Sequence, residues 1–166
     1  MSMSREKLKK WLKVGGLALV GFLVLAQFVP VQRTNPPVGQ EIQAPPEVMA
    51  VLQRSCYDCH SNETVWPAYS RIAPISWLVV HDVKEGRSGV NYSEWGALSD
   101  DDKLHLLEET WEEVEKGEMP LKKYTLIHQD ARLSDADRAT LRDWTRSQLP
   151  PEDMARRERD EDGDVD

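Results

Sequence analysis

Apolar side chains recur at helical spacing through the central part of the chain. After Ser99 and three aspartates, apolar residues return every three or four positions, at Leu104, Leu107, Trp111 and Val114. This spacing places them on one face of a helix. Alternation with a period of two residues, which is typical of a half-buried strand, is absent. The pattern therefore predicts an all-α domain.

Three further helices are expected from residues that favour helix ends. Proline favours the first turn of a helix, a serine or aspartate side chain caps its N-terminus, and glycine commonly ends it. These signals predict a helix that starts at Pro46 and runs into the cysteines, a helix from Ile75 to Glu85 ended by Gly86, and a helix that starts at Ser134 and stops before Pro150.

The first 29 residues follow a different pattern. Five basic residues precede an apolar run, residues 14–29, in which Gln27 is the only polar side chain. As a helix counted from Trp11, this run is about 28 Å long, close to the roughly 30 Å core of a bilayer. We therefore predict a transmembrane helix within residues 1–29, with a cleaved signal peptide as the alternative. The basic end would stay inside, so the expected localisation is single-pass in the inner membrane with the C-terminal domain in the periplasm.

Composition divides the rest of the chain. Residues 30–46 contain five prolines and predict an extended tether, and residues 47–149 form the helical domain. Residues 150–166 are charged and almost free of apolar side chains, which predicts a disordered tail. The chain has 21 basic and 29 acidic residues, a net charge of −8. This charge argues against nucleic acid as a partner and suits a basic protein partner, although it also serves solubility.

The only two cysteines lie together in the stretch RSCYDCHS, as Cys56 and Cys59, with His60 next to the second. C-x-x-C-H is the sequence motif of c-type haem attachment. Two thiols one helical turn apart can add to the two vinyl groups of a porphyrin edge, and the imidazole can then bind the iron. A thiol–disulfide couple is the first alternative, but it lacks a βαβ setting. A structural zinc site is the second, but it needs four ligands.

The candidate ligands for the sixth iron position are Met119, His81, His105 and His128. Met119 lies two residues after Gly117 and directly before Pro120, and a His/Met ligand pair raises the reduction potential of a haem. The alternative role for Met119 is to fill a gap in the core. His128 is the alternative sixth ligand, or a hydrogen-bond partner of a haem propionate, for which Arg71 and Arg87 are also candidates. The other two histidines are expected in the core or on the surface: His81 and His105.

Together these motifs resemble the bacterial haem-binding domain family, which are small membrane-anchored relatives of class I cytochromes c. The resemblance covers about residues 46–148 and rests on successive blocks: RSCYDCHSNETVWPAYSRIAPISW, DVKEGRSGVNYSEW, EEVEKGEMP, YTLIHQDARLS and LRDW. It implies a cytochrome c-like helical fold with an N-terminal transmembrane helix. It also implies one covalent haem c on Cys56 and Cys59, with His60 as axial ligand and Met119 as distal ligand.

We therefore predict a c-type haem protein that transfers single electrons in the periplasm, with redox protein partners that dock at an exposed haem edge. We expect no enzyme activity, because no nucleophile–base pair and no paired carboxylates are found. The alternative function is a haem-based sensor or ligand-binding module, which would need a labile sixth iron position. A haem peroxidase would need the same open position.

Overall fold

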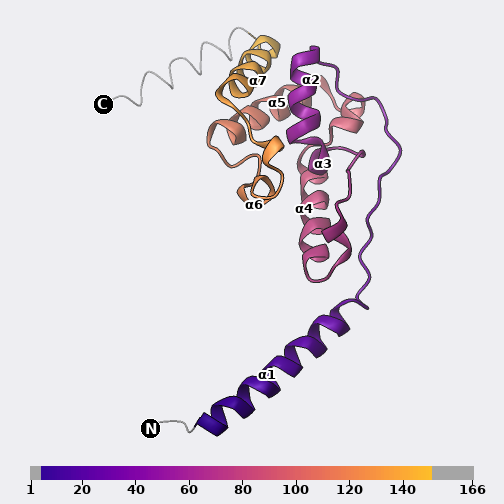
Figure 1. The fold of residues 1–166 in the computed structure, drawn as a ribbon. Helices are drawn as coiled ribbons and strands as arrows, with labels where there is room; N and C mark the ends of the chain where they lie inside the picture. The colour runs from indigo at the N-terminus through magenta and orange to yellow at the C-terminus, as the bar shows by residue number, and fades with distance from the viewer. Residues whose placement is uncertain (1–4, 151–166) are drawn as a thin grey trace.

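A computed structural model describes residues 5–150 of the chain as a helical domain and one helix that stands apart from it (Figure 1). The longer helices are α1 (Arg5–Ala26), α2 (Pro46–Ser55), α4 (Ile75–Gly89), α5 (Asp100–Glu115) and α7 (Asp135–Gln148). The shorter ones are α3 (Tyr57–His60), α6 (Lys122–Thr125) and three 3-10 turns, at Ala68–Arg71, Tyr92–Ala97 and Gln129–Ala131. No strand occurs within residues 5–150, so the all-α prediction is confirmed. The predicted tail lies outside the described residues except for Pro150.

The core of the domain lies where α7 packs against both α2 and α5. Leu52 of α2 and Leu141 of α7 are completely buried there. On α5 the predicted apolar face is the buried one, since Leu107, Trp111 and Val114 all join the core cluster. Burying side chains of this size contributes about 1.5–3 kcal/mol each, so the apolar faces hold these three helices together.

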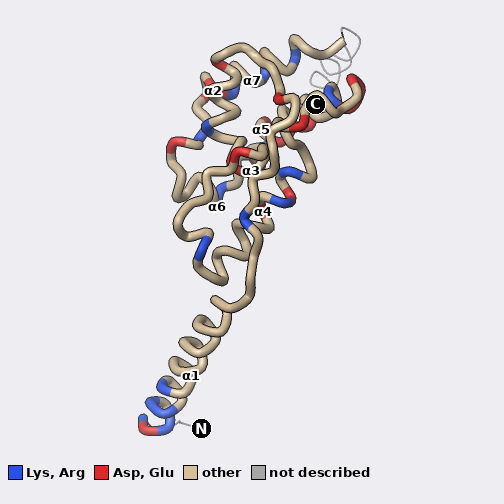
Figure 2. The backbone as a smooth tube through the Cα atoms, turned by 90° about the vertical axis from the view of Figure 1, so that its right-hand side faces the viewer, with Lys and Arg blue, Asp and Glu red and all other residues tan. Residues whose placement is uncertain are grey.

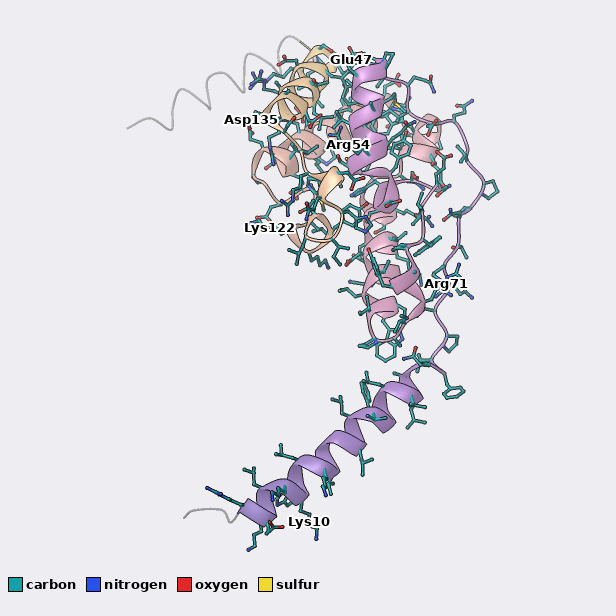
Figure 3. All side chains as sticks on the ribbon, in the orientation of Figure 1. Lys10, Glu47, Arg54, Arg71, Lys122 and Asp135 are labelled. Carbon is teal, nitrogen blue, oxygen red and sulfur yellow. The ribbon has the colours of Figure 1, made fainter. Side chains whose placement is uncertain are left out.

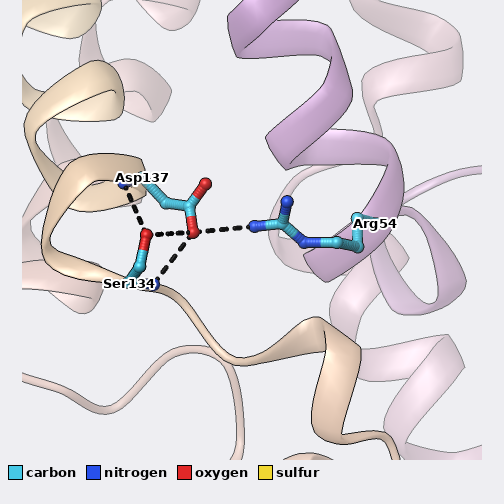
Figure 4. Close-up of polar contacts among 3 residues, drawn as sticks. All are labelled: Arg54, Ser134 and Asp137. Atoms are coloured by element: carbon cyan, nitrogen blue, oxygen red, sulfur yellow. Dashed lines mark hydrogen bonds and ion pairs between the residues drawn. The ribbon is translucent and has the colours of Figure 1, made fainter.

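A capping box fixes the start of α7, as its sequence predicts (Figure 4). The Ser134 hydroxyl accepts a hydrogen bond from the Asp137 amide at 3.1 Å, and the Asp137 carboxylate accepts one from the Ser134 amide at 2.9 Å. The same carboxylate forms an ion pair with Arg54 of α2 at 2.9 Å. The capping box therefore also fastens α7 to the end of the helix that leads into the cysteines.

Helix α4 is longer than the sequence predicts. It continues past Gly86 and ends at Gly89, where the Val90 amide still bonds to the Gly86 carbonyl at 3.0 Å. A glycine that ends a helix usually takes a positive φ. Within residues 5–150 only Gly117 does so, and it follows the end of α5. The expected helix end at Gly86 was therefore wrong.

Helix α1 corrects the prediction about the N-terminus. Within residues 5–150 no helix combines the length and the apolar character that crossing a bilayer requires. Lys and Arg gather in the first turns of α1 (Figure 2) and the helix ends at Ala26. A span of about 20 residues ending there would contain four lysines, at positions 7, 9, 10 and 13. The predicted transmembrane helix, and the single-pass inner-membrane localisation based on it, are therefore contradicted.

The side chains of α1 project from all sides of the helix, which stands apart from the domain (Figure 3). Trp11 and Leu17, for example, are 67% and 74% exposed. The helix meets the domain at its C-terminal end, where Ala26 is buried. There the side-chain amide of Gln27 donates through Nε2 to the Ala73 carbonyl at 3.0 Å and accepts through Oε1 from the backbone amide of Ala73 at 3.1 Å. These two bonds are the first contact between the N-terminal region and the loop before α4.

The segment predicted as a tether is extended, but it lies along the domain. The Ile42 amide donates to the Tyr92 carbonyl at 2.9 Å, and the Gly39 amide donates to the Ser93 carbonyl at 2.9 Å. The Ile42 side chain is 1% exposed and belongs to the core cluster. Residues 39–42 are thus bound to the backbone that follows α4, close to the cysteine motif.

Candidate functional site

A cavity of about 550 Å³ lies beside the cysteine motif, with walls from α3, α4, α5 and the chain that follows α5. Its volume is within the roughly 300–1,000 Å³ typical of ligand and cofactor sites. Four residues singled out in the sequence line this one cavity: Cys56, Cys59, His60 and Met119. The fold thus brings together side chains from both halves of the domain.

The cysteine motif is a nearly continuous extension of α2. The chain bends at Cys56, whose φ of −123° departs from helical values, although its amide still bonds to the Leu52 carbonyl at 2.8 Å. The Cys56 carbonyl then accepts from the amides of Cys59 at 3.1 Å and His60 at 2.9 Å. The two thiols therefore lie about one turn apart, with the imidazole directly after the second, as the sequence spacing predicts.

Both thiols are protonated at neutral pH. Burial is the main cause that raises the pKa of Cys56 to about 12, and Cys59 nearby adds to the effect. Burial likewise raises the pKa of Cys59 to about 11, followed by the negative charges of Asp58 and Asp82. A thioredoxin-like couple needs a lowered thiol pKa. These surroundings therefore disfavour the thiol–disulfide interpretation.

The His60 ring is oriented by a backbone carbonyl. Its Nδ1 lies 3.1 Å from the Val90 carbonyl oxygen, just beyond the end of α4. Since a carbonyl can only accept, Nδ1 carries the hydrogen and Nε2 keeps its free lone pair. Burial lowers the pKa of His60 below 6.5 and outweighs the opposing effect of the Val90 and Gly86 carbonyls. The neutral imidazole with a free Nε2 is the form that binds a metal.

Met119 reaches the cavity because α5 ends in a tight turn. Gly117 has a φ of +71°, a conformation that glycine adopts without steric cost, and the chain reverses there. The Glu113 carbonyl then accepts from the amides of Glu118 and Met119, both at 3.0 Å. This turn places Met119 in the wall of the cavity, while part of the side chain packs against the core cluster.

The alternative sixth ligand, His128, does not line the cavity. Its Nε2 is 2.6 Å from the Tyr69 hydroxyl, and its ring stacks on Tyr124 at 4.3 Å between centroids. The structure also leaves His81 and His105 outside the cavity wall, and His105 pairs with Glu109 at 3.4 Å. Of the residues considered as sixth ligand, Met119 is therefore the one that shares a cavity with His60.

Neither arginine proposed for haem propionates lines the cavity. Arg87 instead donates to the Ser61 carbonyl at 2.7 Å and the Thr34 carbonyl at 2.8 Å. Among the described residues, Lys123 is the only basic one in the wall, and it pairs with Asp82 at 2.9 Å. Acidic residues dominate the polar part of the wall: Asp58, Asp82, Glu85, Glu109, Glu112 and Glu113.

Sequence reasoning did not single out Val90, Tyr92 or Lys123 as parts of the site. The role of Val90 comes from its backbone carbonyl, so the side chain gives no signal. Tyr92 is buried in the cavity wall with its ring 6.2 Å from that of His60, but an isolated tyrosine usually predicts only core. Lys123 could have been found only from its distance to Cys59 in the fold, because 64 positions separate them in the chain.

The side chains present fit a haem of the c type. Two neutral thiols lie one turn apart, a neutral imidazole offers Nε2, and a thioether lies in the wall of the same cavity. Thiol, imidazole and thioether are the groups that attach and ligate a c-type haem. No group of three or more His, Cys, Asp or Glu that could hold a metal ion directly occurs among residues 5–150.

Comparison with protein families supports this interpretation. The family model for the haem-binding domain matches residues 21–147, a range that contains all the residues of the cavity wall. No curated protein and no solved structure matches the chain. The likeness to the cytochrome c fold therefore stays a prediction.

Proposed function

The chain belongs to the haem-binding domain family and binds haem, and from this premise we propose that it carries a single haem attached covalently through Cys56 and Cys59. The convergence of both thiols, His60 and Met119 on one cavity is the observation that carries this proposal. The protonated thiols are consistent with it, because the vinyl additions that form two thioethers consume both S–H groups.

In this proposal the residues of the cavity wall have separate roles. His60 offers Nε2 to the iron, and the Val90 carbonyl holds the ring in that orientation through Nδ1. Met119, in the chain that follows α5, would supply the sixth ligand. Tyr92 is buried beside His60 and excludes water from that side. A haem bound in this way supplies a one-electron couple between ferric and ferrous iron.

One-electron transfer between protein partners is the function that these features support best, with no reaction on a substrate of its own. With His60 and Met119 both as ligands, a haem would supply its one-electron couple without a further molecule at the iron. The acidic cavity wall and the net charge of −8 favour a partner with a basic surface, because opposite charges steer diffusional encounter.

Absorption spectra of the haem-loaded chain test this function. The ferric protein is expected to show the near-infrared charge-transfer band of methionine-ligated iron, and the reduced protein should not bind carbon monoxide. Ready binding of carbon monoxide would instead support a sensor or ligand-binding module with a labile sixth position. Turnover of peroxide in a parallel assay would indicate a peroxidase and contradict the electron-carrier proposal.

A further inference from the structure

Gly86 occupies a position in α4 where glycine is unfavourable. It lies within the helix, three residues before the end at Gly89. Glycine is less favourable in a helix interior than every residue except proline. Its φ is not positive, so the backbone conformation there does not require glycine. The reason for glycine at this position must come from its surroundings.

Those surroundings are the backbone of the cysteine motif. A Cβ atom on Gly86 would lie 2.6 Å from the carbonyl oxygen of Cys59, 3.0 Å from its carbonyl carbon and 3.1 Å from its Cβ. Backbone atoms cannot rotate out of the way, so any side chain would force α3 and α4 apart. By contrast, a Cβ on Gly89 would meet nothing within 4 Å. Close approach of the two helices is thus specific to Gly86.

The same turn of α4 also holds the imidazole of His60, the residue that follows Cys59 in the motif. Val90 is bonded to Gly86 through its amide at 3.0 Å, and its carbonyl accepts the Nδ1 hydrogen of His60 at 3.1 Å. The stretch 86–90 therefore receives the backbone of Cys59 at one end and the ring of His60 at the other. Moving α4 away from α3 would lengthen the bond from His60 to Val90.

We propose that Gly86 is a positioning residue for His60: its lack of a side chain lets α4 lie against Cys59, which keeps the Val90 carbonyl within hydrogen-bond distance of Nδ1. This inference rests on the proposed function. A hydrogen bond donated by the ring nitrogen that does not bind the metal, here Nδ1, raises the basicity of a metal-bound imidazole. Its loss makes His60 a weaker donor, which favours ferrous over ferric iron and raises the reduction potential.

Gly86→Ala and Gly89→Ala form a matched pair for the test, because both add one methyl group to the last turns of α4. The reduction potential and the ferric electron paramagnetic resonance spectrum are measured on the full-length haem-loaded protein. For Gly86→Ala we expect the ferrous/ferric ratio at a fixed ambient potential to rise about tenfold. This corresponds to an increase of ~59 mV in the one-electron reduction potential. The g-values of the ferric spectrum should change as well. Gly89→Ala should match the parent chain in both measurements.

Thermal unfolding in both oxidation states separates positioning from packing alone. A pure packing defect lowers both midpoints equally and leaves the potential unchanged, and that result would overturn the proposal. A Gly86→Ala chain that yields no folded haem protein, while Gly89→Ala does, would also overturn it by assigning Gly86 to folding. If the parent chain itself lacks haem, the proposed function fails. If the parent chain holds haem but Gly86→Ala and Gly89→Ala have the same reduction potential and spectrum, only this inference fails.

Discussion

Met119 and Met49 provide a matched pair for testing the sixth iron position. Met119 lines the cavity, whereas Met49 packs against the core cluster outside it. Met→Leu keeps most of the volume and removes the sulfur, and such exchanges usually cost less than about 1.5 kcal/mol. We expect Met119→Leu to lower the reduction potential by a substantial part of the roughly 0.8 V range that axial ligands span, while Met49→Leu leaves it unchanged. Potentiometric titration measures both, and an equal potential in the two variants would remove Met119 as the ligand.

Asp137 predicts a pH-dependent contribution to stability. Burial raises the pKa of this carboxyl group, but hydrogen bonds from Ser134 and the Arg54 ion pair outweigh it, so the folded pKa lies below 3.8. The contribution is therefore fully present above pH 3.8 and is lost as the pH falls through the folded pKa. Asp137→Asn should cost up to about 1 kcal/mol at pH 7, because it removes the charge from a partly exposed ion pair.

Chemical denaturation of the haem-loaded protein at several pH values measures this cost. Asp135→Asn, in the same first turn of α7, serves as the control and should change stability by less. The difference between Asp137→Asn and the parent chain should shrink as the pH is lowered below 3.8. A difference that is constant with pH would mean that the charge of Asp137 contributes nothing.

At the scale of residues, local spacing predicts the donor atoms of the site but not what orients them. Cys56, Cys59 and His60 are recognisable because their proposed chemistry depends on that spacing. Met119 is indicated by Gly117 two residues before it and Pro120 directly after it. The orientation of His60 depends on the carbonyl of Val90, thirty positions away, and a backbone carbonyl is the same in every residue. Such contacts can be known only from the fold.

Among the elements, Arg87 of α4 binds the extended N-terminal segment to the loop after the cysteine motif. Its guanidinium donates to the carbonyls of Thr34 and Ser61 and also reaches Asn35 and Thr64. Arg87→Gln leaves the carbonyl of the buried Ser61 without its charged donor. Unpaired buried polar groups cost about 1–3 kcal/mol, so we expect a loss of stability of that order.

Thermal unfolding and amide hydrogen exchange test the role of Arg87. Exchange should accelerate within residues 30–45, because the arginine holds that segment. Arg142→Gln is the control: this partly exposed arginine pairs with its neighbour Asp143, and pairs near the surface contribute about 0–1 kcal/mol. Equal effects of the two substitutions would contradict the account.

Helix starts could be predicted more reliably than the other features of the elements. The caps at Ser99 and Ser134 form as expected, because a cap depends on residues three positions apart. The end of α4 and the packing of residues 39–42 could not be predicted in this way. Gly86 lies inside α4 against the backbone of Cys59, and Ile42 bonds to Tyr92. Both partners are distant in the sequence. Local sequence alone therefore predicts a helix end at the glycine and a tether in the proline-rich stretch.

For the whole molecule, the negative charge predicts how fast small redox reagents react. With a net charge of −8 and acidic side chains in the cavity wall, a cationic one-electron reagent should react faster than an anionic one of similar potential. The difference should shrink between 0.01 M and 0.15 M salt, as the screening length falls from about 30 Å to about 8 Å. Stopped-flow kinetics measures both rates.

A charge in the cavity wall should matter more for these rates than one elsewhere. Glu85→Gln is expected to reduce the preference for the cationic reagent, since Glu85 lines the cavity. Glu47→Gln, at the start of α2 and outside the cavity wall, removes the same charge and serves as the control. If both variants change the rates equally, net charge alone determines the preference and the cavity is not where electrons enter.

Denaturing mass spectrometry of the full-length chain, matured in a host that attaches haem c, decides whether the haem is covalently bound. We expect a mass increase of one haem that survives denaturation and disappears in the Cys56→Ala, Cys59→Ala double variant. A matured parent chain whose mass shows no haem, or a double variant that keeps it, would contradict the account.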